Sequence, residues 1–441
     1  MEFLSHRKGA ESWRVPLLVA AAGTVMRLAW YYLAPRPSHV PIESENIAIA
    51  LATTGRFADT YGAGSGLTAH TSPVMPSIIA GLYEIFGVDT PAAHDAMAVL
   101  AVLLLSLSFL GFYALFGALG ASRNARLAGL AICNLVPMQP ALELNQLSRW
   151  EIPLALALLP LLLVWLLRLD ARPELRLRDL ALPALAAGGL VFTSVAAGAA
   201  ACAGLGLLVL RRLPPRRWPA AALLLVAGLA LWLGPWALRN QQALGRPILT
   251  RSNAGLELAL SYNDMMLNDQ DRRGAYVERL SQINPLYPGA RAAARAAGGE
   301  LAYNDGHGAI AKRWMIEHPM GTLRLMMRHV RQLVVPPAWF FATWGDAPPR
   351  AVEERRWLLG LAMLVSLAGL PWLLWRNPRY LYIALAMAAL AAPYVVVQPI
   401  LRYRYLLYAP SVMLACDLVF RMLAAWLARR GLAGRPMAAA E

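Results

Sequence analysis

Charged residues and cysteines are both scarce in this sequence, and each shortage excludes a class of protein. Only 15% of the 441 residues are charged and 58% are hydrophobic, with a mean hydropathy of +0.46. That balance excludes an ordinary soluble globular domain. The cysteines lie in or beside apolar runs without the spacing of metal ligands, which argues against a disulfide framework and against a cysteine zinc site. They are Cys133, Cys202 and Cys416.

Two functional patterns are also missing from the sequence. It has no glycine-rich segment of the P-loop or dinucleotide-binding type, so we expect no nucleotide-binding loop. It has no internal repeat with paired broken helices, which is the usual sign of a secondary transporter. The first absence argues against an enzyme that binds a free nucleotide. The second argues against a secondary transporter built from internal repeats.

Hydrophobic runs of about 20 residues recur along most of the chain, and each can cross a hydrocarbon core of about 30 Å as a helix. A single run near the N-terminus could be a signal peptide, but a series of runs cannot. We therefore predict an all-α integral membrane protein with about ten transmembrane helices. They are expected at residues 16–34, 92–118, 126–142, 150–168, 180–193, 196–212, 218–236, 355–375, 379–397 and 405–427.

The basic residues predict the topology. The net charge of +15 is divided among short clusters between apolar runs, so no nucleic-acid partner is expected. If the ten helices alternate in direction, every cluster falls on one side, which the positive-inside rule makes the cytoplasm. A single helix over 180–212 would reverse the later clusters, so two helices fit better. The clusters are Arg7/Lys8/Arg14, Arg123/Arg126, Arg168/Arg172/Arg176/Arg178, Arg211/Arg212/Arg216/Arg217, Arg376/Arg379 and Arg429/Arg430.

This topology predicts an inner-membrane protein with both termini in the cytoplasm and two long segments on the outer face. The first segment is the loop 35–91, within a membrane unit 1–238. The second is a helical segment, 239–354, whose amphipathic run 319–334 is expected in the membrane interface. A last membrane unit follows over 355–441. Because both segments share a face with the mouth of the bundle, we predict an extracytoplasmic active site capped by loops.

Several short motifs occur in a definite order along nearly the whole chain. They are Glu43–Ala48, Leu51–Phe57, Gly66–Pro76, Trp150-Glu151, Pro235–Asn240, Gly245–Pro247, Ser252–Leu258, Gly299–Tyr303, Glu317–Pro319 and Arg402–Tyr405. Together they resemble the GT-C-type glycosyltransferases, in particular bacterial relatives of protein O-mannosyltransferases and lipid A aminoarabinose transferases. The resemblance implies a GT-C-like helix bundle that transfers a sugar from a polyprenyl-phosphate donor to an acceptor hydroxyl or similar group outside the membrane.

A carboxylate in the first outer loop is the expected catalytic base. A hydroxyl that attacks an anomeric carbon must lose a proton, and a positioned base contributes roughly 10²–10⁴-fold to the rate. The family often presents Asp, or an Asp-Glu pair, where this chain has Glu43 and Glu45, so both are candidates and Glu43 is favoured. Their alternative role is that of acids at a helix start, where negative charge suits the helix dipole.

Arginines on the outer face are the expected ligands of the donor phosphate. Guanidinium groups bind phosphate bidentately and stabilise the charge that grows on the leaving group. The candidates are Arg149, Arg239, Arg402 and Arg404. The last two stand against the positive-inside rule, which an anionic ligand would explain, whereas Arg239 follows Pro-Trp and suits an interfacial anchor nearly as well.

The remaining candidates line or support the substrate site. His70 lies in a loop rich in Gly, Thr and Pro, and Trp150-Glu151 opens a helix; each also has a purely structural interpretation. Arg27 lies inside the first apolar run, where an unpaired charge costs about 2.5–3.5 kcal/mol, so it should pair with a carboxylate.

We expect no metal and no cofactor, since the lipid-linked sugar is a substrate. Glu43, Glu45 and Asp59 could in principle hold a divalent ion, but the sequence shows no compact ligand cluster. Two other functions stay open: a transporter or flippase that moves a lipid-linked sugar without chemistry, and a membrane scaffold. A scaffold would leave the acidic pair near basic residues unexplained, and substitution of Glu43 distinguishes an enzyme from either.

Overall fold

The computed structural model describes residues 12–34, 39–136, 140–269, 273–342 and 349–430. Apart from one bridge between Ala58 and Leu67, these residues contain no β-structure, which confirms the all-α prediction. Arg7 and Lys8 of the first basic cluster, and the first residues of the predicted outer loop, 35–38, lie outside the described residues.

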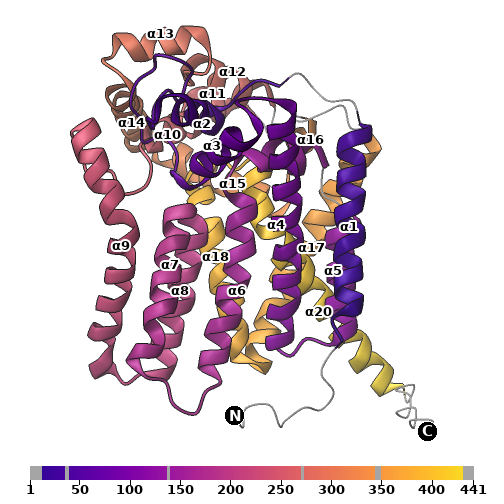
Figure 1. Cartoon of the computed structure of the whole chain (residues 1–441). Helices are drawn as coiled ribbons and strands as arrows, with labels where there is room; N and C mark the ends of the chain where they lie inside the picture. Colours follow the sequence, from indigo (N-terminus) through magenta and orange to yellow (C-terminus); the bar gives the residue numbers. More distant parts are fainter. Residues whose placement is uncertain (1–11, 35–38, 137–139, 270–272, 343–348, 431–441) are drawn as a thin grey trace.

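Among the described residues, eight helices are long and apolar enough to cross a membrane, and they stand side by side in one bundle (Figure 1). Each corresponds to one of the predicted spans. They are α1 (Arg14–Leu33), α4 (Pro91–Ala118), α6 (Ile152–Asp170), α8 (Val195–Arg212), α9 (Trp218–Leu244), α17 (Pro349–Arg376), α18 (Leu381–Val396) and α20 (Tyr408–Arg429).

The two other predicted spans are short helices inside the bundle. These helices, α5 (Arg123–Leu135) and α7 (Ala181–Thr193), have 13 residues each. At 1.5 Å per residue each covers about 20 Å, which is less than the hydrocarbon core. The chain breaks at Ser194, so α7 and α8 are two helices, as predicted. A Cβ atom on Gly188 of α7 would lie 2.3 Å from a backbone oxygen of α9, so the helices pack backbone to backbone.

The basic clusters gather at one end of the bundle. α1 begins and α20 ends there (Figure 1). Asp170 lies 3.5 Å from the guanidinium groups of both Arg211 and Arg379, which belong to two different predicted clusters. Arg421 donates to the carbonyl of Gly120 at the same end. The grouping of the clusters agrees with the predicted alternation, while the assignment of this end to the cytoplasm stays a prediction.

Short helices cover the opposite end of the bundle (Figure 1). Glu300 joins the two outer segments, because its carboxylate accepts hydrogen bonds from the hydroxyls of Thr68 and Ser252. The predicted boundaries at 238 and 354 stay predictions. The first segment supplies α2 (Glu43–Thr54) and α3 (Val74–Phe86). The second supplies α10 (Ala254–Ser261), α11 (Asp264–Asn268), α12 (Arg273–Ile283), α13 (Pro288–Ala296), α14 (Glu300–Glu317), α15 (Pro319–Val334) and α16 (Trp339–Ala342).

Helix α15 is amphipathic, as its sequence predicts. Leu325 and His329 are buried, whereas Met320 and Met327 are 71% and 58% exposed. An exposed apolar stripe on a helix at the loop end of a membrane bundle suits the lipid interface. Its position in that interface stays a prediction.

The buried Arg27 has the carboxylate partner that its position requires. Its Nε lies 2.7 Å from Oε2 of Glu143, and both side chains are almost fully buried. Tyr405 donates to the other carboxylate oxygen at 2.8 Å. Glu143 lies on a π-helical turn over Leu142–Gln146, and a short helix α19 (Leu401–Arg404) precedes Tyr405. The ion pair therefore ties α1 to two later parts of the bundle.

Candidate active site

A cavity of about 1460 Å³ lies where the short helices meet the bundle. Residues from several separate parts of the chain line it. Glu43 and His70 come from the first outer segment, Glu257 and Tyr276 from the second, and Arg402 from the segment that leads into α20. The cavity lies at the loop end of the bundle, where the sequence predicts a capped site, and its identity as an active site stays a prediction.

Glu43 reaches this cavity because of the way α2 begins. Glu45 accepts the backbone N–H of Ile42 at 3.1 Å, which caps the first turn, and Ser44 donates to the carbonyl of Arg149 at 2.7 Å. With the helix start fixed, Glu43 faces the cavity and is 9% exposed. Asn284 donates to its Oε1 with a separation of 3.3 Å. A carboxylate so placed can accept a proton from a group bound in the cavity.

Glu45 is turned away from the cavity and is fully buried. Its Oε2 accepts from Nη1 of Arg149 at 2.9 Å, and its Oε1 lies 3.0 Å from Nε2 of His39. Burial alone would raise the pKa of Glu45, but the contact with His39 and the charge of Arg149 outweigh it and lower the pKa below its ordinary value. Glu45 thus anchors the start of α2, and which of the two acids acts in catalysis stays untested.

Arg402 is a predicted phosphate ligand that lines the cavity and forms no ion pair that would neutralise it among the described residues. Its guanidinium carbon lies 4.0 Å from the ring centroid of Trp150, and one nitrogen donates to the hydroxyl of Tyr403 at 2.9 Å. Its Nε has no hydrogen-bond partner among the described residues. Arg149 lines the same cavity, but it donates to Glu45 and to the carbonyl of Asn145.

The other two predicted arginines do not line the cavity. Arg239 donates to the carbonyls of Phe57 and Thr68, both at 2.7 Å, and so holds the first outer loop against α9. Arg404 is fully buried and donates to the carbonyl of Leu359 at 2.8 Å. The predicted role of both residues in phosphate binding stays untested.

The three predicted loop residues lie at or beside the cavity. His70 lines it, and its Nδ1 lies 3.0 Å from the hydroxyl of Tyr61. Trp150 forms the face on which Arg402 stacks. Glu151 pairs with Arg251, which itself lines the cavity.

Sequence reasoning missed several residues of this wall. Glu257 lies on α10, within the motif Ser252–Leu258, and nothing in that motif alone indicates its role. Its burial raises the pKa of its carboxyl, against the opposing charge of Arg402. Arg273 and Arg355 also line the cavity, from α12 and α17. They had no sequence signal, because each lies at or near the start of its helix, where a charged residue is unremarkable.

Glu43, Glu45 and Asp59, the three acids that could in principle hold a divalent ion, do not gather into one cluster among the described residues. Glu45 points away from the cavity, and Oδ1 of Asp59 accepts the backbone N–H of Gly66 at 3.0 Å. The wider expectation that the protein uses no metal or cofactor stays untested.

The fold resembles that of solved oligosaccharyltransferase structures, which agrees with the GT-C-type bundle expected from the sequence. One solved structure with this fold is AglB of Archaeoglobus fulgidus in complex with an inhibitory peptide and a dolichol-phosphate. It is 13% identical with a TM-score of 0.51, and the match covers 97% of this chain and 52% of AglB. The same organism's oligosaccharyltransferase in complex with Zn and sulfate is 15% identical with a TM-score of 0.51, over 95% and 50% of the two chains.

The present chain thus spans about half the length of those oligosaccharyltransferases. ArnT of Cupriavidus metallidurans bound to undecaprenyl phosphate also matches, at 13% identity and a TM-score of 0.36, over 95% of this chain and 80% of ArnT. No protein-family model and no curated protein sequence matches the chain.

Proposed function

We propose that this protein is a membrane glycosyltransferase that moves a sugar from a polyprenyl-phosphate donor, undecaprenyl phosphate in a bacterium, to an acceptor outside the membrane. One observation carries the proposal: a carboxylate, Glu43, and a guanidinium, Arg402, line the same cavity from opposite ends of the chain. A base and an anion-stabilising group are the two functions that this reaction requires. The fold shared with AglB supports the same class of reaction.

In the proposed step the oxygen of an acceptor hydroxyl attacks the anomeric carbon of the donor sugar. The bond between that carbon and the phosphate oxygen breaks, and the hydroxyl proton passes to Glu43. The departing phosphate gains negative charge, which Arg402 stabilises by a charge-assisted hydrogen bond. Only protein groups contact the reacting atoms in this step, and the lipid-linked sugar is a substrate rather than a cofactor.

The charges of the cavity wall favour an anionic donor. Two of the lining arginines, Arg149 and Arg251, are neutralised by ion pairs with Glu45 and Glu151. The remaining arginines still outnumber the lining carboxylates, which leaves a positive cavity. They are Arg273, Arg291, Arg355 and Arg402, against Glu43 and Glu257. A cavity with low-dielectric walls and one sign of charge concentrates ligands of the other sign.

The proposal places the site on the outer face of the bacterial inner membrane. The basic clusters lie at the end of the bundle away from the short helices, and the positive-inside rule assigns that end to the cytoplasm. The polyprenyl tail would remain in the lipid, with its phosphate at the cavity.

Mass spectrometry of lipids that copurify with the protein tests the donor class first. We expect a polyprenyl-phosphate sugar or the free polyprenyl phosphate. The purified lipid-linked sugar is then offered to the protein in proteoliposomes, and the release of polyprenyl phosphate is followed. Glu84→Gln, which alters an exposed carboxylate on α3, serves as the matched control for Glu43→Gln. Movement of the intact lipid-linked sugar across the bilayer without release would favour a flippase and contradict the proposal.

A further inference from the structure

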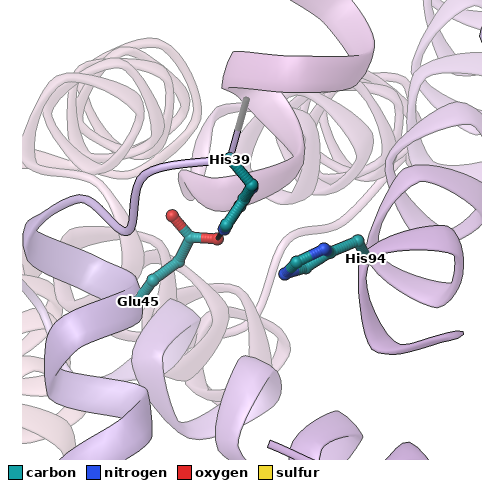
Figure 2. A group of neighbouring side chains, drawn as sticks. All are labelled: His39, Glu45 and His94. Carbon is teal, nitrogen blue, oxygen red and sulfur yellow. Dashed lines mark ion pairs between the residues drawn. The ribbon is translucent and has the colours of Figure 1, made fainter. Parts of the chain in front are cut away.

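Four side chains that can bind a metal meet outside the cavity, where three segments of the chain come together. They are His39, which precedes α2, Glu45 on α2, Asp89 in the turn before α4, and His94 on α4. Figure 2 shows the ring of His39 close to the carboxylate of Glu45, with the ring of His94 directed toward the same place. None of the four residues lines the active-site cavity.

The nitrogen and oxygen atoms of this cluster converge on one small volume. Nε2 of His39 lies 3.0 Å from Oε1 of Glu45 and 3.4 Å from Oδ1 of Asp89. Nε2 of His94 lies 2.9 Å from the same Asp89 oxygen. One ligand atom from each of His39, Glu45 and His94 falls within 4.8 Å of the others. Ligand atoms around a tetrahedral zinc ion at 2.0–2.2 Å are about 3.3–3.6 Å apart, so the cluster needs only a small adjustment to hold one.

One oxygen of the cluster is buried and available to a cation. Oε2 of Glu45 is occupied by Arg149 and by the backbone of Ile42. Oε1 accepts no hydrogen bond of good geometry from any described residue, although the Glu45 side chain is fully buried and His39 is close. A buried carboxylate oxygen that accepts no hydrogen bond has lost its contacts with water and gained no protein donor in their place, which costs free energy. A metal ion at this point would satisfy it.

The charges and the ring geometry also suit a metal. With neutral imidazoles, the two carboxylates and Arg149 leave one net negative charge, which a divalent cation reverses. The rings of His39 and His94 stack with centroids 3.8 Å apart. Two protonated imidazoles at that distance would repel each other, whereas two neutral imidazoles can both direct a nitrogen to one ion. Paired imidazole and carboxylate ligands favour zinc over magnesium or calcium, which prefer oxygen.

We propose that His39, Glu45, Asp89 and His94 bind a zinc ion that fastens the start of α2 to the start of α4. Four protein ligands would close the coordination shell, as in structural zinc sites. Because Glu45 is two residues from Glu43, the ion would also hold the proposed catalytic base in position. That second consequence rests on the proposed function, whereas zinc binding itself does not.

Zinc binding is tested on the full-length protein in detergent, with any affinity tag removed. The protein is stripped with a chelator, and zinc is titrated against a chromophoric competitor. We expect one equivalent of tightly bound zinc and, when cobalt replaces zinc, the visible absorption of a tetrahedral site. His94→Ala should weaken binding by more than about a hundredfold, since even outer-sphere partners of a metal contribute 10–100-fold. His318→Ala, which alters an exposed histidine between α14 and α15, should bind zinc like the unmodified protein.

Asp89→Asn provides a second variant in case His94→Ala does not fold. Asp89 is 40% exposed and has a φ of 57°, a conformation that asparagine also tolerates, so the turn should persist while the charged ligand is lost. We expect weaker zinc binding here too. Equal zinc binding by the unmodified protein and both variants would identify an adventitious ion and overturn the proposal, as would the absence of binding in the unmodified protein.

The positioning role has its own readout. Restoring zinc to the stripped protein should raise the rate of sugar transfer in the unmodified protein and not in Asp89→Asn. If the protein binds zinc but transfers sugar equally with and without it, the ion does not position Glu43. If no form of the protein transfers sugar, the proposed function fails while the zinc titration still decides the metal site.

Discussion

Arg402→Ala should weaken the binding of a polyprenyl phosphate, by the free energy of the charge-assisted hydrogen bond that is lost. The guanidinium lies over the ring of Trp150 and donates to the hydroxyl of Tyr403, and these two contacts hold it at the cavity wall. Because Arg402 lines the cavity, we expect a phosphate oxygen there to accept a charge-assisted hydrogen bond from its guanidinium group. Such a bond contributes about 1.5–3 kcal/mol, which corresponds to a 10- to 150-fold rise in Kd.

The assay is equilibrium binding of undecaprenyl phosphate to the purified protein in lipid nanodiscs. Arg402→Lys should restore the affinity only in part, because lysine keeps the charge but lacks the planar fork that stacks and binds bidentately. Arg404→Ala is the comparison, since Arg404 was predicted to bind phosphate but is buried outside the cavity. We expect its loss to lower thermal stability more than affinity. Unchanged affinity in Arg402→Ala would refute the phosphate-binding role.

Three further predictions concern topology, the buried ion pair and pH. A cysteine at the half-exposed Asp305 should react with an impermeant thiol reagent added outside intact spheroplasts, and protection there would contradict the topology. Arg27→Met should lower stability by about 3–5 kcal/mol, since it leaves Glu143 buried without its partner, and a thermal unfolding curve like that of the unmodified protein would argue against this. Burial lowers the pKa of His329 from 6.5 to about 4. On acidification the unfolded chain therefore binds a proton near pH 6.5, whereas the folded protein binds it only near pH 4. Acidification from pH 7.5 to 5 should therefore cost about 2 kcal/mol, and His329→Gln should flatten that dependence of the apparent Tm.

The membrane bundle could be predicted from the sequence because long apolar runs and arginine clusters are independent signals that agree. The two short helices show where that reasoning weakens. α5 and α7 have only 13 residues each, so neither reaches the length that identifies a span from hydropathy. The positive-inside rule, rather than hydropathy, predicts the break near Ser194, because a single helix there would put the later basic clusters on the other side of the membrane.

The candidate site could be predicted only in part, for reasons of helix geometry. Glu43 and Glu45 are separated by two positions, or about 200° around a helix, so only one can face the cavity. The sequence does not fix the rotation of α2, which depends on Arg149 about a hundred residues later. Arg27 could be predicted to pair, but its partner lies on a π-helical turn that no periodicity indicates. His39 and His94 are brought together by tertiary packing. Their spacing in the sequence therefore does not predict that they meet.

The rate of a single turnover with Glu43→Gln tests the central claim most directly. Enzyme is used in excess over the lipid-linked sugar, because release of polyprenyl phosphate could otherwise limit kcat and hide the chemical step. We expect the transfer rate to fall by about a hundredfold or more while donor affinity changes little, since glutamine keeps the shape but cannot take the proton. Glu45→Gln should slow transfer less, and Glu84→Gln should transfer normally. A Glu43→Gln protein that transfers sugar at a near-normal rate would contradict the account.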